Sequence, residues 1–418
     1  CRRQRQMCIR DRCIPPALCS GARYLQQRTP RDARVTWRAR GVPSGGMSGP
    51  LASLKVVEFT GLGPAPLAGQ LLADLGAEVT VIDRARAEAD PTDVNRRGKR
   101  SITLNLKSRE GLAVAQRMIA DADILIEGFR PGVMERLGLG PDDCPDTLIY
   151  GRMTGWGQTG PKAHTAGHDI NYLAMTGALH AIGPADRPPV VPLNLVADFG
   201  GGTMFLIFGV LAAVIERGIS GKGQVVDAAM IDGVPAMMGL IHSMIARGDW
   251  HNTRESNWLD GASHFYRTYE CADGKFIAVG SLEPQFFAEL VHGLGLDTAE
   301  TDLQMNQSLW PTHADIFAKI FRTRTRDEWE ALFEGTDACV APVLDFKEAC
   351  LHPANTAREV FYQESGVWQA SPAPRFSRSV SSRPHAPRGQ GDSASEILAE
   401  LGYSPADLDA LQKAGALP

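Results

Sequence analysis

A regular pattern of apolar and polar residues begins in this chain just after Met47. Leu54–Phe59 (LKVVEF) and Glu78–Asp83 (EVTVID) are short apolar runs, and each predicts a strand. Leu67–Leu75 lies between them and predicts a helix that ends at Gly76. A strand, a helix and a second strand in this order predict two parallel strands joined by a right-handed crossover.

A second unit of the same kind follows the first. Ser108 stands where it can cap a helix, and Asp123–Glu127 (DILIE) predicts the strand after that helix. Further strands are expected at Ser101–Leu106 and Leu148–Tyr150. This alternation predicts an α/β fold, in which a large Rossmann-like domain is built on a parallel sheet.

The most apolar run of the chain has 17 residues, from Phe199 to Ile215, and it includes three consecutive glycines. An acid flanks it at each end, Asp198 and Glu216. A helix that crosses a membrane needs about 20 apolar residues. We therefore predict a buried helix over Phe199–Arg217 and no transmembrane segment.

The pattern changes in the second half of the chain. Residues 248–262 are polar and without a regular period, which is typical of a linker. Tyr266–Cys271 and Lys275–Gly280 flank Asp273-Gly274, a dipeptide that predicts a hairpin with a type I′ turn. A smaller α+β domain is predicted here, with helices near residues 284–294, 312–323 and 326–334.

Two capping boxes predict the starts of later helices, Thr325 with Glu328 and Ser393 with Glu396. We therefore divide the chain into an N-terminal segment (1–46), a large α/β domain (47–247), a linker (248–262), a small α+β domain (263–358) and a C-terminal segment that returns to the large domain (359–418).

Charge is distributed unevenly along the chain. Residues 1–46 hold 11 Arg and 2 Asp, a net charge of +9, whereas the whole chain has a net charge of −5, so the remainder carries −14. A body this acidic has no general reason to bind nucleic acid. Any anionic ligand must therefore be held by local arginines.

Cysteines are concentrated in residues 1–46, which show no helical or strand period. A transit peptide and a cysteine-rich metal knuckle are alternatives, but we expect this segment to be non-native or disordered, with translation starting at Met47. The other four cysteines form no CxxC pair, which predicts no zinc site and no disulfide framework and suits a reducing cytoplasm.

Two motifs of the large domain suggest anion binding. The turn Gly61–Pro66 (GLGPAP) follows a strand, but it lacks a third glycine and its prolines have no N–H groups, which argues against nicotinamide or flavin binding. Asp83 and Arg84 stand at the end of the next strand. There Asp83 could bind a ribose and Arg84 its phosphate, or both residues could be a solvated strand end. Asn95–Arg100 (NRRGKR) holds four cations and is a candidate phosphate site or a solvated loop.

Three ionisable residues are candidates for catalysis. His168 follows a glycine-rich loop, residues 154–161, although a structural role is the alternative. Asp198 precedes the long apolar run, where it is an N-cap, a carboxylate that faces a ligand, or both. Glu283 stands at a predicted helix start, where an acid is ordinary unless it has a partner.

Six segments carry a resemblance to a known family: EGFRPGVMERLGLG (127–140), GRMTGWGQTGP (151–161), AGHDINY (166–172), PLNLVADFGGG (192–202), SGKGQVVDAAMIDG (220–233) and TYECADGKFIAVGSLEPQF (268–286). Together they resemble the alpha-methylacyl-CoA racemases of the family III CoA-transferase fold, from about Met47 to residue 385. Relatives that transfer CoA keep an Asp at the position of Asp198 but lack a His at that of His168. The tail segment ELGYSPADLDAL (400–411) resembles the C-terminal helix of those transferase relatives.

The resemblance implies His168 and Asp198 as the two catalytic bases, with Glu283 orienting His168. It also implies an interlaced homodimer, in which the large domain of one subunit and the small domain of the other form each site. The implied CoA contacts are Arg84, Leu104, Asn105, Leu106, Lys107, Gly128, Phe129, Arg130, Arg136, Gly167, Asp169, Ile170, Asn171 and Tyr172.

The implied enzyme is an isomerase that interconverts (2R)- and (2S)-2-methylacyl-CoA thioesters. One base removes the Cα proton, and the conjugate acid of the other returns a proton to the opposite face of the enolate. N–H groups of the helix start near Asp198 are expected to hold the enolate oxygen. No metal or organic cofactor is required, because CoA is part of the substrate. The rival functions are a CoA transferase with Asp198 as nucleophile and an idle acyl-CoA-binding protein, and His168 argues against both.

Overall fold

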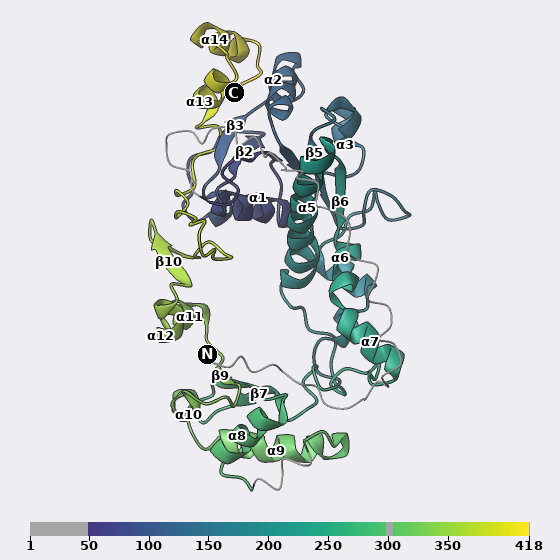
Figure 1. Ribbon diagram of the computed structural model, residues 1–418, viewed down its shortest axis with the longest axis vertical. Helices are drawn as coiled ribbons and strands as arrows, with labels where there is room; N and C mark the ends of the chain where they lie inside the picture. Colours follow the sequence, from purple (N-terminus) through teal and green to yellow (C-terminus); the bar gives the residue numbers. More distant parts are fainter. Residues whose placement is uncertain (1–48, 298–303, 418) are drawn as a thin grey trace, which may run out of the picture. The chain divides into compact units, whose positions relative to one another are not determined.

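The computed structural model of the protein describes residues 49–297 and 304–417 (Figure 1). The predicted N-terminal segment, 1–46, and the predicted start at Met47 lie outside the described residues. The largest sheet has six parallel strands in the order β3-β2-β1-β4-β5-β6. These strands are β1 (Lys55–Phe59), β2 (Glu78–Asp83), β3 (Arg100–Thr103), β4 (Ile124–Glu127), β5 (Ile149–Thr154) and β6 (Val225–Ala229).

Helices cover both faces of this sheet, so the predicted α/β fold is confirmed (Figure 1). Val56 and Val57 of β1 point to opposite faces, as neighbours in a strand must, and each belongs to a separate apolar core. The core around Val56 includes α1 (Pro64–Asp74), α4 (Asp169–Met175), α5 (Met204–Ser220) and α6 (Met230–Met237). The core around Val57 includes α2 (Arg109–Ala120), α3 (Val133–Arg136), α13 (Ala394–Glu400) and α14 (Pro405–Lys413).

Local sequence determines where two of the helices begin. The hydroxyl of Ser108 accepts a hydrogen bond from the Gly111 N–H at 3.0 Å, which confirms the predicted cap of α2. α1 begins at Pro64, three residues before the predicted start at Leu67. Proline favours the first turn of a helix, where its missing N–H costs no hydrogen bond.

A second sheet, β7-β8-β9, is antiparallel and packs with helices around aromatic side chains. Its predicted hairpin is confirmed, but the type I′ turn is wrong. Gly274 has φ of 74°, whereas Asp273 is not left-handed, and the Gly274 N–H donates to Cys271 O at 3.1 Å. This is a type I turn that continues into a left-handed glycine. The elements of this region are β7 (Tyr266–Glu270), β8 (Phe276–Gly280), α8 (Pro284–Gly293), α9 (Trp310–Phe321), α10 (Arg326–Phe333) and β9 (Val340–Pro342).

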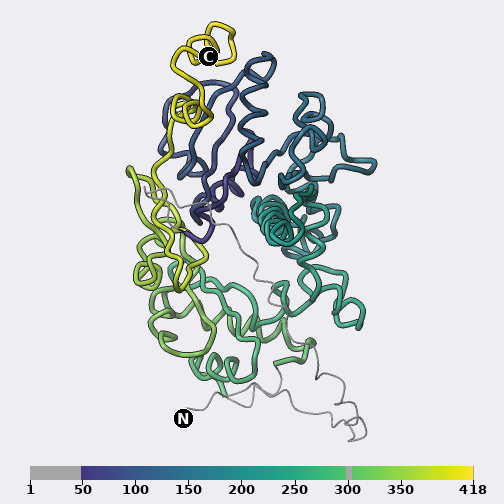
Figure 2. Tube along the Cα trace, turned by 45° about the horizontal axis from the view of Figure 1, so that its top comes forward, coloured from purple at the N-terminus to yellow at the C-terminus, as the bar shows by residue number. Residues whose placement is uncertain are grey.

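The C-terminal segment runs along the outer edge of β3, as Figures 1 and 2 both show. The Gly391 N–H donates to Ser101 Oγ at 2.7 Å, and the Ser393 N–H donates to Ser101 O at 3.0 Å. The predicted capping box at Ser393 does not form, because its hydroxyl accepts from the Ser101 N–H instead. α11 (Phe346–Leu351) and α12 (Pro353–Ala357) precede this segment, and β10 (Phe361–Glu364) and β11 (Val367–Ala370) form its first part.

The long apolar run forms a π-helical segment, η4 (Leu195–Thr203), continued by α5. By length and composition alone, residues 195–220 are sufficient to cross a membrane, but α5 also packs on β5 and β6. The prediction of a buried helix is wrong for one face: Phe208 and Ile215 are 73% and 62% exposed. α7 (Gly239–Arg247) follows α6 and exposes apolar side chains as well.

Candidate active site

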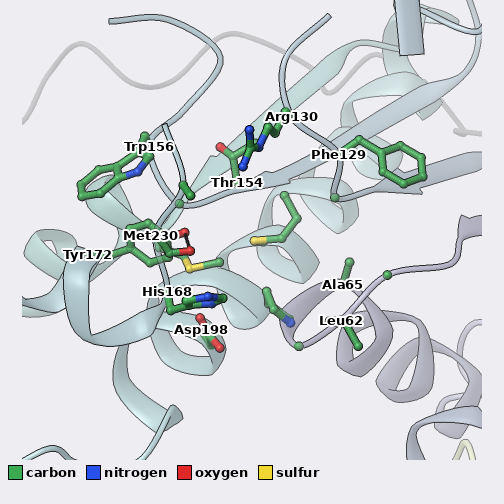
Figure 3. A pocket seen from close by; sticks show the side chains of 18 of the residues that line it. Leu62, Ala65, Phe129, Arg130, Thr154, Trp156, His168, Tyr172, Asp198 and Met230 are labelled. Atoms are coloured by element: carbon green, nitrogen blue, oxygen red, sulfur yellow. Dashed lines mark hydrogen bonds between the residues drawn. The ribbon is translucent and has the colours of Figure 1, made fainter. Parts of the chain in front are cut away.

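A pocket of about 870 Å³ opens at the carboxyl ends of the parallel strands (Figure 3). Loops after β1 and β4 meet there, and this is the position where the strand order of the sheet reverses direction. Loops at such a position diverge and leave a crevice, so it is the usual ligand site of open α/β sheets. Its lining includes residues 60–65, Arg84, residues 128–131, residues 153–156, residues 165–168, Tyr172, Asp198 and Met230.

His168 and Asp198 line this one pocket, although 30 residues separate them in the sequence (Figure 3). His168 immediately precedes α4, and its N–H donates to Asn171 Oδ1 at 3.1 Å. Asp198 lies within η4. A Cβ built on Gly63, where φ is 72°, would lie 3.5 Å from Asp198 Oδ2. That distance is an ordinary contact, so the positive φ, and not a lack of space, favours glycine at this position.

Asp198 does not cap the helix that contains it, so the N-cap prediction is wrong. The π-helical segment begins three residues earlier, at Leu195, after Asn194. Asp169 supplies acceptors from another element: its Oδ2 accepts from the Ala197 N–H at 2.9 Å and from the Asp198 N–H at 2.8 Å. These two N–H groups are therefore occupied and are not available to a ligand oxygen.

The surroundings of Asp198 make its carboxyl easier to protonate than that of an exposed aspartate. Burial raises the pKa of Asp198, and the nearby charge of Asp169 raises it further. The amide of Asn194, 3.4 Å from Asp198 Oδ2, and the charge of His168 act in the opposite direction. The net shift of the pKa is upward, so the pocket holds a carboxyl group that can serve as a base or, once protonated, as an acid.

Several of the other residues named by sequence lie at this pocket. The guanidinium of Arg84 stands over the ring of Phe129, with 5.5 Å to the ring centroid. The hydroxyl of Tyr172 donates to Gly167 O, which closes the loop before His168. The residues expected to bind CoA that line the pocket are Arg84, Gly128, Phe129, Arg130, Gly167 and Tyr172.

Other residues of the expected set lie elsewhere. Leu104 is buried in the core beside α2, and Asn105 donates from its N–H to Ala416 O at 2.9 Å. Glu283 is the N-cap residue of α8 and does not line the pocket with His168. The remaining residues outside the pocket lining are Leu106, Lys107, Arg136, Asp169, Ile170 and Asn171.

The basic run Asn95–Arg100 is neither a phosphate site nor a solvated loop, so both interpretations are wrong. Each of its cations contacts a carboxylate on another element: Arg96 with Asp83 (2.6 Å), Arg97 with Asp74 (2.6 Å), Lys99 with Glu58 (2.7 Å), and Arg100 with Glu400 (2.8 Å) and Glu78. Asp83 is buried, which also overturns both its ribose-binding interpretation and its interpretation as a solvated strand end.

Sequence reasoning missed several residues that shape the pocket. Trp156 packs edge-on against Tyr172, with 4.8 Å between ring centroids (Figure 3). The Nζ of Lys162 stands over the indole of Trp156. The glycine-rich loop at 154–161 was the signal that pointed to this region. Met153 and Met230 add apolar surface. Within residues 49–297 and 304–417, no group of three or more His, Cys, Asp or Glu side chains is arranged to hold a metal ion.

Known proteins similar to this chain support the assignment of the fold. A protein from Mus musculus called alpha-methylacyl-CoA racemase is 43% identical over 86% of this chain and 95% of its own length. The Homo sapiens protein of the same name is 41% identical over 85% of this chain and 94% of its own length. The crystal structure of a CaiB/BaiF family protein from Brucella suis has a TM-score of 0.69 at 26% identity and covers 85% of this chain and 100% of that chain. Residues 51–391 match CoA-transferase family III, and this chain belongs to that family.

Proposed function

We propose that this protein interconverts (2R)- and (2S)-2-methylacyl-CoA thioesters by a two-base proton transfer at Cα. The observation that carries the proposal is the presence of His168 and Asp198 in one pocket. The similar proteins from mouse and human that are called alpha-methylacyl-CoA racemase support the same assignment.

In each turnover of the proposed reaction, one of the two residues acts as the base and the other as the acid. Neutral His168 removes the Cα proton of one epimer, and protonated Asp198 returns a proton to the opposite face of the enolate. The other epimer uses ionised Asp198 as the base and protonated His168 as the acid. The raised pKa of Asp198 favours this exchange of roles, because it lies closer to the ordinary pKa of histidine. The imidazolium formed at His168 also stabilises the negative charge of the enolate.

The pocket offers separate surfaces to the two parts of the thioester. Arg84 and Arg130 supply positive charge for the phosphates of CoA, and neither has a carboxylate partner among the described residues. Met153 and Met230 give apolar surface for the acyl chain. No cofactor is part of the proposed reaction, because the thioester itself acidifies the Cα proton.

We also propose that the active protein is a homodimer. Glu283 is the expected partner of His168, yet it does not line the pocket of its own chain. A second copy would supply it. Apolar side chains exposed on α5, α6 and α7 support such a contact, because exposed apolar area of this kind marks an interface: Phe208, Ile215, Ile219, Met237, Leu240 and Ile245.

Incubation of one pure epimer of a 2-methylacyl-CoA in deuterated water tests the proposal. Deuterium at Cα of both epimers, without any acceptor acid, is the expected result. His168→Ala should abolish Cα exchange for one epimer, and Asp198→Asn should abolish it for the other, with losses of at least about 100-fold.

Two other results would overturn the proposal. CoA exchange between carboxylic acids without Cα deuterium would indicate a transferase in which Asp198 attacks the thioester. Tight binding of the CoA ester with neither reaction would indicate a binding protein. The dimer is tested by mixing Glu283→Gln and His168→Ala chains during refolding, because one hybrid site is then intact; full activity of dilute monomers would contradict the shared site.

A further inference from the structure

Asp169 connects the two proposed bases through the main chain. It follows His168 directly in the sequence, and its side chain is 6% exposed. Its Oδ2 accepts hydrogen bonds from the N–H groups of Ala197 and Asp198, 2.9 and 2.8 Å away. A single carboxylate therefore joins the residue after one base to the backbone of the other.

The π-helical segment needs an acceptor of this kind. In a π-helix each N–H bonds to the carbonyl five residues earlier, so the first N–H groups of η4 have no partner inside the segment. Asn194 precedes the segment and makes no capping bond to its backbone. Asp169, which lies 28 residues before Ala197 in the sequence, supplies the acceptor for the N–H groups of Ala197 and Asp198. As a result, Asp198 does not have to cap its own helix, and its side chain remains in the pocket.

The position of Asp169 separates it from the groups that touch a ligand. It does not line the pocket, although His168 and Asp198 on either side of this contact do. Its charge is one cause of the raised pKa of Asp198. Its Oδ1 is buried and has no hydrogen-bond partner within the described residues, and no Lys or Arg of those residues forms an ion pair with the carboxylate.

We propose that Asp169 is a positioning residue that fixes the Asp198 carboxyl relative to His168, rather than a contact to CoA. The proposal rests on the two-base function given above. Asp169 then has two effects on Asp198. Its two N–H bonds fix the position of the Asp198 carboxyl, and its negative charge favours protonation of that carboxyl.

Two substitutions separate these effects. Asp169→Asn keeps an oxygen that can accept both N–H bonds but removes the charge, whereas Asp169→Ala removes both. We expect Asp169→Ala to lower the rate of Cα exchange by about 100-fold at saturating CoA ester, because small errors in the position of a reacting group are costly. Asp169→Asn should restore most of that rate. In both variants, the acid limb of the pH profile should move to lower pH for the epimer that Asp198 deprotonates, because a like charge beside Asp198 is gone.

Asp345 provides a matched control. Its Oδ1 also accepts from two successive N–H groups, those of Lys347 and Glu348, each at 2.8 Å, but it lies at the start of α11 and outside the pocket lining. Asp345→Ala should lower the melting temperature without moving the pH profile. A pH profile of Asp169→Asn identical to that of the unsubstituted protein would overturn the proposal, as would a raised KM with unchanged turnover.

A second measurement does not depend on the reaction. Hydrogen exchange of the peptide that contains residues 195–203 should speed up by about tenfold or more in Asp169→Ala and stay close to its original rate in Asp169→Asn. Equal protection in all three proteins would overturn the positioning role. Absence of Cα deuterium with the unsubstituted protein would instead refute the two-base function, so the two failures are distinguishable.

Discussion

Two neighbouring regions of the parallel sheet differ in whether their cations are paired with carboxylates. In Asn95–Arg100, beside β2 and β3, all four cations pair with carboxylates of other elements. At the pocket between β1 and β4, Arg84 and Arg130 have no carboxylate partner within the described residues. In this acidic protein, a dense basic sequence stabilises the sheet, whereas isolated arginines remain available to an anion.

The buried pair of Lys99 and Glu58 tests the structural half of this comparison. Both side chains are almost fully buried, and Lys99 Nζ donates to Glu58 Oε2 at 2.7 Å. Burial raises the pKa of Glu58 and lowers that of Lys99, and the main opposing influence on each group is the charge of the other. Lys99→Met should therefore lower the free energy of unfolding by about 3–5 kcal/mol, because Glu58 is left without its cation.

The double variant Lys99→Met with Glu58→Leu is the control for that loss. Replacing both charges with apolar groups should recover most of the stability in urea unfolding, and Cα exchange should persist, since neither residue lines the pocket. A double variant as unstable as the single one would show that the residues act through packing instead of charge.

Arg84 and Arg100 test the functional half of the comparison. Arg84→Ala should raise the KM for a CoA ester by about 10- to 100-fold, because the variant cannot form the charged hydrogen bond to the ligand. The melting temperature of the free protein should stay nearly unchanged, because that bond exists only in the complex. Arg100→Ala should do the reverse, because Arg100 pairs with Glu78 and Glu400. Steady-state kinetics and thermal unfolding of the two variants decide this, and equal KM values in both would break the distinction.

His264 provides a third kind of ionisable group, one that lacks a hydrogen-bond partner at either ring nitrogen in the described part of the chain. Burial among aromatic rings, together with the charges of His313 and Arg267, lowers its pKa to about 3 from 6.5. The unfolded chain therefore binds a proton more readily below pH 6.5, and stability is lost as the pH falls from 6.5 toward 3. Between pH 7 and pH 5 the loss should be about 2 kcal/mol.

His264→Phe should remove this share of the acid sensitivity in urea unfolding measured at the two pH values. The exposed His292 offers the matched control, because His292→Phe should leave the pH dependence as it was. The same slope in all three proteins would assign the acid sensitivity to carboxylates elsewhere.

Sequence predicted best the features that depend on near neighbours. The strands around α1, the Ser108 cap and the hairpin after Tyr266 all follow from residues within a few positions of each other. The α/β class could be predicted because the order of strands and helices largely determines it. His168 and Asp198 were also placed correctly in one pocket, through the resemblance to a known family.

Three of the errors share one physical cause, which is a partner distant in sequence. Asp198 has the composition of an N-cap, but Asp169 takes the N–H groups. Ser393 has the spacing of a capping box, but Ser101 takes its hydroxyl. The basic run seemed free for an anion because its carboxylates lie on β1, β2, α1 and α13. Local patterns carry no information about such partners.

The contact between β3 and the C-terminal segment can form only late in the synthesis of the chain. Ser101 and Gly391 are 290 residues apart, so a ribosome has made nearly the whole protein before this contact can form. Until then the outer edge of β3 is open, and an open strand edge can pair with other chains. A nascent chain that stalls before α13 leaves this edge uncovered, and we expect it to aggregate more readily than the full chain.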